Sequence, residues 1–175
     1  MTEFIISKLY HSKLFQNSKL KIRNFNLMAE LSIKFMIVTP ERTVFEDAVS
    51  QVTLPTAAGE ITILPNHRSY IASLNPGEVM VKKDGEEILL SISGGFIEFN
   101  GNELTVLADT AERAEEIDLK RAEEGRVRAQ KIKEEKVTMD EEEYASVAAA
   151  IQKESARIRV AKKHYTKKGI SINNQ

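Results

Sequence analysis

The chain has no cysteine and no tryptophan among its 175 residues, and only four prolines and eight glycines. The absence of cysteine excludes disulfide bonds, thiol nucleophiles and thiolate metal sites, and it is compatible with a reducing compartment. Without tryptophan, a core has to be built from Val, Ile, Leu and Phe. The length allows one domain, or one compact domain with an appendage.

The sequence also lacks a strong charge bias and a long apolar run. Its 25 basic and 26 acidic residues give a net charge of −1, so no global attraction to nucleic acid or anionic lipid is expected. No run approaches the roughly 20 apolar residues that a membrane span needs. We therefore expect no nucleic-acid partner and no direct membrane insertion, and any membrane association has to come through another protein.

Motifs that carry enzyme chemistry are missing as well. The sequence contains no nucleophile elbow, zinc-protease, Walker or dinucleotide-binding motif. His67 follows Pro65-Asn66 in a turn, where packing against a strand is a simpler interpretation than a catalytic or metal role. Gly94-Gly95 lies between two strand-like runs, which indicates a bulge or a close backbone approach rather than phosphate binding. We expect neither a catalytic residue nor a metal site.

Residues 1–27 differ in composition and periodicity from the rest of the chain. They carry five basic residues against one acid and show no clean periodicity. Two interpretations remain open: a targeting presequence, since such segments are basic and poor in acids, or a spurious upstream extension, since a regular pattern opens at Met28. We favour the extension, expect it to be disordered, and leave it out of the fold.

Residues 28–109 read as short strands separated by turn residues. Asp84-Gly85 and Asn100-Gly101 favour tight hairpin turns, because these residue types tolerate a positive φ. Val79 and Val81 before the first turn alternate as half-buried strands require. Many short strands at this spacing indicate an all-β sandwich or barrel. The predicted strand-like runs are 31–38, 43–54, 61–64, 70–74, 78–83, 86–93, 96–99 and 103–108.

Residues 110–165 change to a helical period, with no proline and one glycine. Small residues on the first predicted helix let two helix axes approach closely. Thr138 and Glu141 form a capping-box signature that starts a second helix. The short connection near 134–138 predicts an antiparallel α-helical hairpin, followed by a tail, 166–175. The two apolar stripes are Ala114, Ile117, Ala122, Gly125, Ala129 and Ile132, and then Tyr144, Val147, Ala148, Ile151 and Ile158.

Stripes this thin stabilise a hairpin only weakly. Each alanine buries little area, at roughly 25 cal/mol per Å². We therefore expect the hairpin to dock on the sandwich or on another protein, and to undock at a low cost in free energy. That is the physical requirement for a movable arm.

The segment from Glu112 to Arg128 contains a candidate nucleotide site. Asp118 and Arg121 are one helical turn apart, and Arg128 lies two turns further on. Arginine forks bind phosphate oxygens bidentately, an aspartate accepts hydrogen bonds from adenine or ribose, and Arg157 of the second helix would close over the site. The alternative, which spacing alone favours, is a helix surface of ion pairs worth about 0.2–0.5 kcal/mol each.

Five stretches in order resemble the epsilon subunit of bacterial and chloroplast F-type ATP synthases, the counterpart of mitochondrial delta. The resemblance covers residues 30–165. It implies a ten-stranded sandwich followed by a helical hairpin, in agreement with the pattern above. The stretches are Val38-Thr39-Pro40, Ile63-Leu64-Pro65-Asn66-His67, Ser93-Gly94-Gly95-Phe96-Ile97-Glu98, Leu104-Thr105-Val106-Leu107-Ala108 and Ala111-Glu112-Arg113-Ala114-Glu115-Glu116-Ile117-Asp118.

The resemblance implies a non-catalytic rotor subunit that couples proton translocation to ATP synthesis. Its sandwich would bind the gamma subunit and the c-ring at the foot of the central stalk, peripherally at the cytoplasmic face of the bacterial plasma membrane. Its helices would inhibit ATP hydrolysis when they extend toward the alpha/beta catalytic head, and permit it when they are folded. The competing interpretation is a free-standing protein-interaction adaptor, which co-purification with stalk subunits would distinguish.

The resemblance also implies ATP as a regulatory ligand, with no required cofactor. The family motif I/L-D-x-x-R-A is present from Ile117 to Ala122. Lys153 stands where the family has an arginine, and a lysine cannot reproduce a bidentate fork, which argues against tight binding. The residues matched to the family's ATP contacts are Glu112, Ile117, Asp118, Arg121, Ala122, Arg128 and Arg157.

Overall fold

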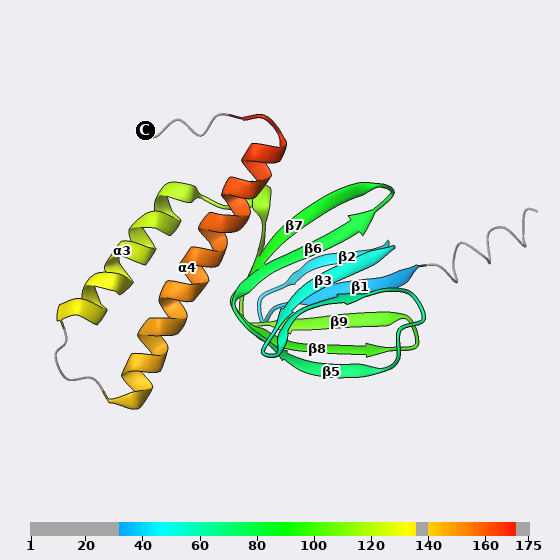
Figure 1. Ribbon diagram of the computed structural model, residues 1–175, viewed down its shortest axis with the longest axis horizontal. Coiled ribbons are helices and arrows are strands. Elements are labelled where there is room, and N and C mark those ends of the chain that lie inside the picture. Colours follow the sequence, from blue (N-terminus) through cyan, green and yellow to red (C-terminus); the bar gives the residue numbers. More distant parts are fainter. Residues whose placement is uncertain (1–31, 136–139, 171–175) are drawn as a thin grey trace, which may run out of the picture.

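The computed structural model describes residues 32–135 and 140–170. Within them, strands form a sandwich and two helices lie beside it (Figure 1). The expectations for residues 1–27, for Thr138 and for the end of the tail fall outside the described residues. The strands are β1 (Ile33–Val38), β2 (Thr43–Val49), β3 (Gln51–Thr56), β4 (Gly59–Ile63), β5 (Tyr70–Leu74), β6 (Gly77–Lys83), β7 (Glu86–Ile92), β8 (Gly95–Asn100), β9 (Glu103–Ala108) and β10 (Ala111–Arg113).

The strands form one sheet that folds over itself. Its order is β10-β7-β6-β3-β5-β8-β9-β1-β2, with β4 paired to β3 off this path. Neighbours in the described sheet are antiparallel except for β1 and β9, which are parallel. In Figure 1, β6 and β7 form one layer and β5, β8 and β9 the other. Phe35, Leu54, Leu90 and Phe99 are fully buried in the core, and the predicted all-β sandwich is confirmed.

Two hairpin turns show how local sequence directs the sheet. Asp84 and Gly85 have φ angles of +52° and +84° and join β6 to β7, as predicted. In the second turn, Gly101 and Asn102 have φ angles of +58° and +63°, while Asn100 pairs with Glu103 inside the ladder. The second turn therefore lies one residue later than predicted, because asparagine tolerates a positive φ on either side of the glycine.

Gly95 marks the closest approach between two strands. Its φ is +132°, and a Cβ atom there would overlap the carbonyl oxygen of Leu107 on β9. The expectation of a close backbone approach at Gly94-Gly95 is confirmed.

The predicted strand and helix limits were wrong at two places. The run 43–54 is two strands, which part at Ser50, whose N–H donates to the carbonyl of Lys82 at 2.9 Å. The sheet also continues past residue 109, since β10 pairs with β7. A 3₁₀ turn, η2 (Ala114–Glu116), follows, and helix α3 (Leu119–Glu135) begins only at Leu119. Ala114 and Ile117 are therefore buried beside the sheet, not on a helix stripe.

The second helix, α4 (Glu141–Lys167), begins differently from the predicted capping box. Its N-cap is Asp140, whose Oδ1 accepts a hydrogen bond from the N–H of Glu143 at 2.7 Å. Glu141 is the first helical residue and not the third, so the helix does not start from the predicted box. An aspartate suits the N-cap because its carboxylate accepts from a free backbone N–H and lies at the positive end of the helix dipole. The helix also extends to Lys167, into the predicted tail.

The two helices form the predicted antiparallel hairpin (Figure 1). Ala122 and Ala129 of α3 and Ala156 of α4 are buried, so small residues do permit close packing. The stripe predicted for α4 was only partly right. Tyr144 is 51% exposed, whereas burial concentrates further along, at Ala156, Val160 and Ala161, because only this half of α4 faces the sheet.

Candidate functional site

Arg157 on α4 is the centre of a partly buried group of charges, which we call the Arg157 cluster: Arg157, Glu112 and Glu154. The Nε and Nη2 atoms of Arg157 donate to the two carboxylate oxygens of Glu112 at 2.8 and 3.2 Å. Its Nη1 donates to Glu154 at 2.7 Å. The Arg157 side chain is only 14% exposed, against 38% for Glu112 and 18% for Glu154.

Three elements bring this cluster together. Glu112 lies on β10, opposite Ser91 of β7, and Glu154 lies one turn before Arg157 on α4. Gly125 of α3 leaves room for Glu154, because a Cβ atom at Gly125 would approach the Glu154 Cδ to 3.1 Å. Burial lowers the pKa of Arg157, but the hydrogen bonds to both carboxylates outweigh it, and the net shift of the pKa is upward.

Asp118 begins helix α3. Its Oδ1 accepts a hydrogen bond from the N–H of Arg121 at 3.0 Å, and its carbonyl accepts from the N–H of Ala122 at 3.0 Å. This is the geometry of an N-cap. Ala122 and Ile117, on either side, are buried, so these two motif residues pack the hairpin and present no side chain at the surface.

The remaining motif residues lie along the surface of α3. Arg121 is exposed, and Arg128 forms an exposed i,i+4 ion pair with Glu124 at 3.9 Å. The structure thus joins Glu112 to Arg157, and Asp118 to the backbone of Arg121, while the ion pair of Arg128 with Glu124 is that of an ordinary helix surface. Sequence reasoning missed Glu154, although its i,i+3 spacing from Arg157 was a usable signal.

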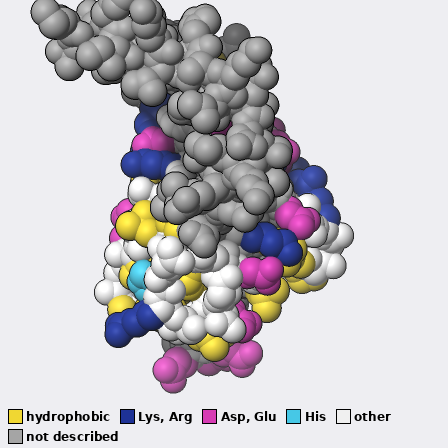
Figure 2. Space-filling view, turned by 90° about the vertical axis from the view of Figure 1, so that its right-hand side faces the viewer, with side chains coloured by type: hydrophobic (Ala, Val, Ile, Leu, Met, Phe, Trp, Pro, Cys, Tyr) yellow, Lys and Arg dark blue, Asp and Glu magenta, His cyan; other side chains and the backbone are white. Residues whose placement is uncertain are grey.

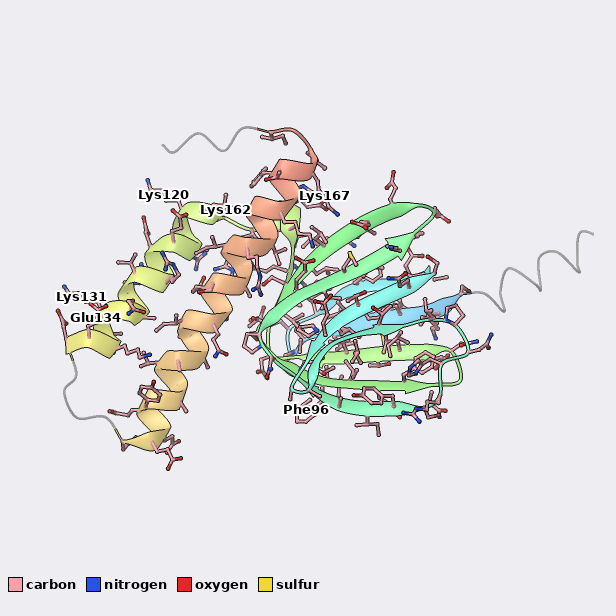
Figure 3. The ribbon with its side chains drawn as sticks, viewed as in Figure 1. Phe96, Lys120, Lys131, Glu134, Lys162 and Lys167 are labelled. Carbon is pink, nitrogen blue, oxygen red and sulfur yellow. The ribbon has the colours of Figure 1, made fainter. Side chains whose placement is uncertain are left out.

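A small apolar cluster and two ion pairs dock the hairpin on the sheet. Val160 and Ala161 of α4 pack with Leu89 of β7 and with Ile117. Lys163 binds Glu78 of β6 at 2.5 Å. Lys167, which points toward β7 in Figure 3, binds Glu87.

The opposite layer of the sandwich carries an exposed apolar patch: Ile71, Phe96 and Leu107. These side chains are 74%, 61% and 57% exposed. Phe96 pairs across the strands with Leu107, and Ile71 pairs with Glu98 on the same face of β8; Figure 3 labels Phe96 at the outer edge of this layer. Phe96 and Leu107 also line a cavity of about 690 Å³, whose far wall includes Ala149 and Gln152 of α4.

Residues 32–135 and 140–170 are also compatible with neither of two further classes of site, a metal centre and a membrane-spanning helix. No group of three or more His, Asp or Glu side chains in this part of the chain is arranged to hold a metal ion. His67 packs edge-on to Phe99, with ring centroids 5.9 Å apart, as expected for a loop residue against a strand. None of the described helices has the length and apolar character needed to cross a membrane.

Comparisons with known proteins agree on one family. The family model described as "ATP synthase, Delta/Epsilon chain, beta-sandwich domain" matches residues 32–114. The ATP synthase epsilon chain of Herpetosiphon aurantiacus is 39% identical over 132 residues, which cover 75% of this chain and 96% of the relative. The epsilon chain of Pelotomaculum thermopropionicum is 45% identical over 103 residues, covering 59% of this chain and 77% of the relative.

A solved structure shares the fold. A chain of the Euglena gracilis mitochondrial ATP synthase, in a structure of its OSCP, F1 and c-ring parts, superposes with a TM-score of 0.62 at 22% identity. The superposition covers 72% of this chain and 79% of the other. At this identity the likeness is one of fold alone.

Proposed function

This chain belongs to the family of ATP synthase epsilon chains, and we propose that it serves the complex without catalysing a reaction itself, its sandwich joining the rotor and its hairpin regulating ATP hydrolysis. The rotor role follows from the family. The observation that supports separate roles for the two parts is that a well-packed sandwich is joined to a hairpin with a small apolar contact. Catalysis then belongs to other subunits, and this chain sits peripherally at the cytoplasmic face of the membrane.

The apolar patch supports a docking surface for the gamma subunit. Monomeric proteins rarely expose neighbouring large apolar side chains without using them, and here Ile71, Phe96 and Leu107 are adjacent on three strands. The c-ring is the second proposed partner, at the end of the sandwich away from the helices. Figure 2 faces that end, where hydrophobic, acidic and basic side chains are mixed.

The hairpin supports a regulatory arm. Its contact with the sheet rests on Val160, Ala161 and a few neighbours, on the pair of Arg157 with Glu112, and on ion pairs to Glu78 and Glu87 that are partly exposed. Exposed ion pairs contribute little, about 0–1 kcal/mol each. In this proposal the arm leaves the sheet and extends toward the alpha/beta catalytic head, where it blocks ATP hydrolysis.

ATP is the proposed regulatory ligand of the folded hairpin. Support comes from the family motif around Asp118 and Arg121, and from the position of Arg157 beside Glu112. Arg121→Ala is expected to weaken ATP binding while assembly stays intact, since the exposed Arg121 side chain has no part in the hairpin interface. Calorimetric titration of the isolated chain measures this, and unchanged curves, or no heat from the unaltered protein, would remove ATP from the proposal.

The rotor attachment is tested by a charge placed in the apolar patch. Phe96→Glu is expected to abolish co-purification with the gamma subunit and leave the far-ultraviolet circular dichroism spectrum unchanged. Val127→Glu is the matched control, because Val127 is 58% exposed on α3 and lies outside the patch. Equal recovery of gamma with both variants would contradict this docking surface, and recovery of no stalk subunit with the unaltered chain would favour the adaptor.

A further inference from the structure

The guanidinium of Arg157 is already occupied by carboxylates of its own chain. Glu112 takes the side-on edge, through Nε and Nη2, and Glu154 takes Nη1. All three nitrogens therefore have a partner, and the side chain is 14% exposed. Three of its five N–H groups are therefore in use, and an incoming anion meets two carboxylates that are already in place.

The carboxylates of Glu112 and Glu154 differ in how they affect a phosphate that approaches Arg157. A phosphate or a carboxylate binds a guanidinium through two parallel hydrogen bonds along one edge. The edge left by Glu112 is the end-on one, between Nη1 and Nη2, and Glu154 holds one of its two nitrogens. A nucleotide phosphate that takes this edge with Glu112 in place therefore shares Nη1 with the Glu154 carboxylate, and the two anions compete for it.

We propose that Glu154 is an internal competitor for the nucleotide, its carboxylate binding Arg157 in place of a phosphate and keeping the hairpin folded when ATP is absent. This inference rests on the proposed ATP regulation of the same hairpin and specifies which residue competes with ATP there. Glu154 lies at the crossing of α3 and α4 beside Gly125, and Glu112 lies on β10. The Arg157 cluster therefore ties α4 to β10 of the sandwich without any ligand, and α3 packs beside it at Gly125.

The consequence is that folding of the hairpin depends less on ATP. If folding of the hairpin needed a nucleotide, Arg157 would face two helices without a counter-charge in the ATP-free state. Here the chain supplies two counter-charges, Glu112 from β10 and Glu154 from α4 itself, one turn away. When ATP binds, its phosphate replaces one anionic partner of Arg157. The binding free energy gained is then only the difference between the two interactions.

The test uses the full chain, with Glu154→Gln as the main variant and Glu123→Gln as the control. Glutamine keeps the shape of Glu154 and removes its charge. Glu123 forms an exposed ion pair with Lys162 between the same two helices, at 3.1 Å, so its variant removes an equal charge and an interhelical pair without touching Arg157. The two readouts are hydrogen exchange of α3 and α4 amides without nucleotide, with β8–β9 as internal reference, and calorimetric titration with ATP.

The Glu154→Gln variant is expected to exchange its helix amides about tenfold faster than the unaltered chain, the effect of losing one charge-assisted hydrogen bond. It is also expected to bind ATP about threefold to tenfold more tightly. The Glu123→Gln variant should change either quantity by less than about threefold. Unchanged exchange, weaker ATP binding, or an equal gain in Glu123→Gln would overturn the proposal.

Failure of the proposed ATP regulation has a separate signature. If neither the unaltered chain nor Glu154→Gln gives any heat with ATP, both the regulation and the competition are refuted. The exchange data then still decide whether the Arg157 cluster holds the hairpin folded, because that measurement contains no nucleotide.

Discussion

Asp118 combines a structural contact with a proposed ligand contact, and the two have to be separated before its role is assigned. Its carboxylate already accepts a hydrogen bond from the N–H of Arg121 at the start of α3. An N-cap aspartate also stabilises a helix through the positive end of the helix dipole. Loss of ATP binding on changing Asp118 to alanine would therefore prove little by itself.

Serine separates the two roles, because it caps a helix about as well as aspartate but carries no charge. We expect Asp118→Ala to destabilise α3 by about 1 kcal/mol, seen as faster amide exchange in its first turn. Asp118→Ser should restore that exchange to nearly the original rate but leave ATP binding weak. Recovery of both properties in the serine variant would show that Asp118 acts through the cap alone.

Asp47 provides a pH-dependent contact within the sandwich. The hydrogen bond from Lys83 at 2.5 Å, helped by the N–H of Ala48, holds the pKa of Asp47 below its usual value. A carboxyl group whose folded-state pKa is lowered contributes stability above its unfolded pKa of about 3.9. That contribution is lost as the pH falls through the lowered folded-state value.

We therefore expect Asp47→Asn to lose less stability than the unaltered chain when the pH falls from about 5 to about 2. Urea unfolding at a series of pH values measures the difference. Glu46→Gln, at the exposed neighbouring position of β2, is the control and should keep the original acid sensitivity. If the asparagine variant follows the same curve as the parent, the Lys83 contact is not coupled to folding.

At the scale of elements, local sequence was sufficient wherever a turn demanded particular residues. The β6–β7 hairpin follows from Asp84 and Gly85, and the sandwich core follows from period-two strands around them. The break at Ser50 was missed because no glycine or proline marks it. β10 was missed because an Ala-Glu-Arg tripeptide has high helix propensity, and only pairing with β7 makes it a strand.

In the candidate site, too, only the contacts between residues close in sequence were predictable. Residues within one helical turn, such as Asp118 and Arg121, were placed together correctly. Contacts between distant segments depended on the docking of α4, which no local pattern encodes. The predicted hairpin placed Arg157 over the site, and the resemblance made Glu112 and Arg157 contacts of ATP, but their direct pairing across 45 residues was not predicted. The participation of Glu154 in the Arg157 cluster was not predicted either.

The missed strand leads to a prediction about truncation. A chain that ends after Asp109 lacks β10 and exposes the edge of β7, whereas a chain that ends after Ile117 keeps the β10–β7 hydrogen bonds and the buried Ala111 and Ala114. We expect the longer form to fold into a sandwich with the higher thermal midpoint, and to assemble without inhibiting hydrolysis. Equal midpoints in calorimetry would show that β10 adds nothing to the sheet.

At the scale of the whole molecule, two kinds of force hold the hairpin on the sandwich. The apolar contact is small, centred on Leu89, Val160 and Ala161, and does not depend on salt. One ion pair joins the largely buried Arg157 to Glu112 of β10. The ion pairs of Lys163 with Glu78 and of Lys167 with Glu87 have side chains between 19% and 45% exposed. Such pairs are screened as the Debye length shrinks from about 10 Å at 0.1 M salt to about 3 Å at 1 M.

The balance between these forces predicts that salt releases the hairpin selectively. Raising sodium chloride from about 0.1 M to about 1 M should speed amide exchange in α4 severalfold, while the core strands β8 and β9 keep their protection. Glu87→Gln should expose α4 already at low salt and flatten its salt dependence. Glu86→Gln, at the exposed neighbouring position, should behave as the unaltered chain does.

Acid supplies an independent check on the same contact. The hydrogen bond from Lys167 lowers the pKa of Glu87 in the docked state, so docking stabilised by this pair is retained above the ordinary glutamate pKa of about 4.3 and is lost as the pH falls through the lowered value. Glu87→Gln should remove this acid-induced increase in α4 exchange together with the salt effect. A variant that loses one response but keeps the other would show that the Lys167 pair does not control docking by itself, and that another ion pair, of Lys163 with Glu78 or of Arg157 with Glu112, accounts for the remaining response.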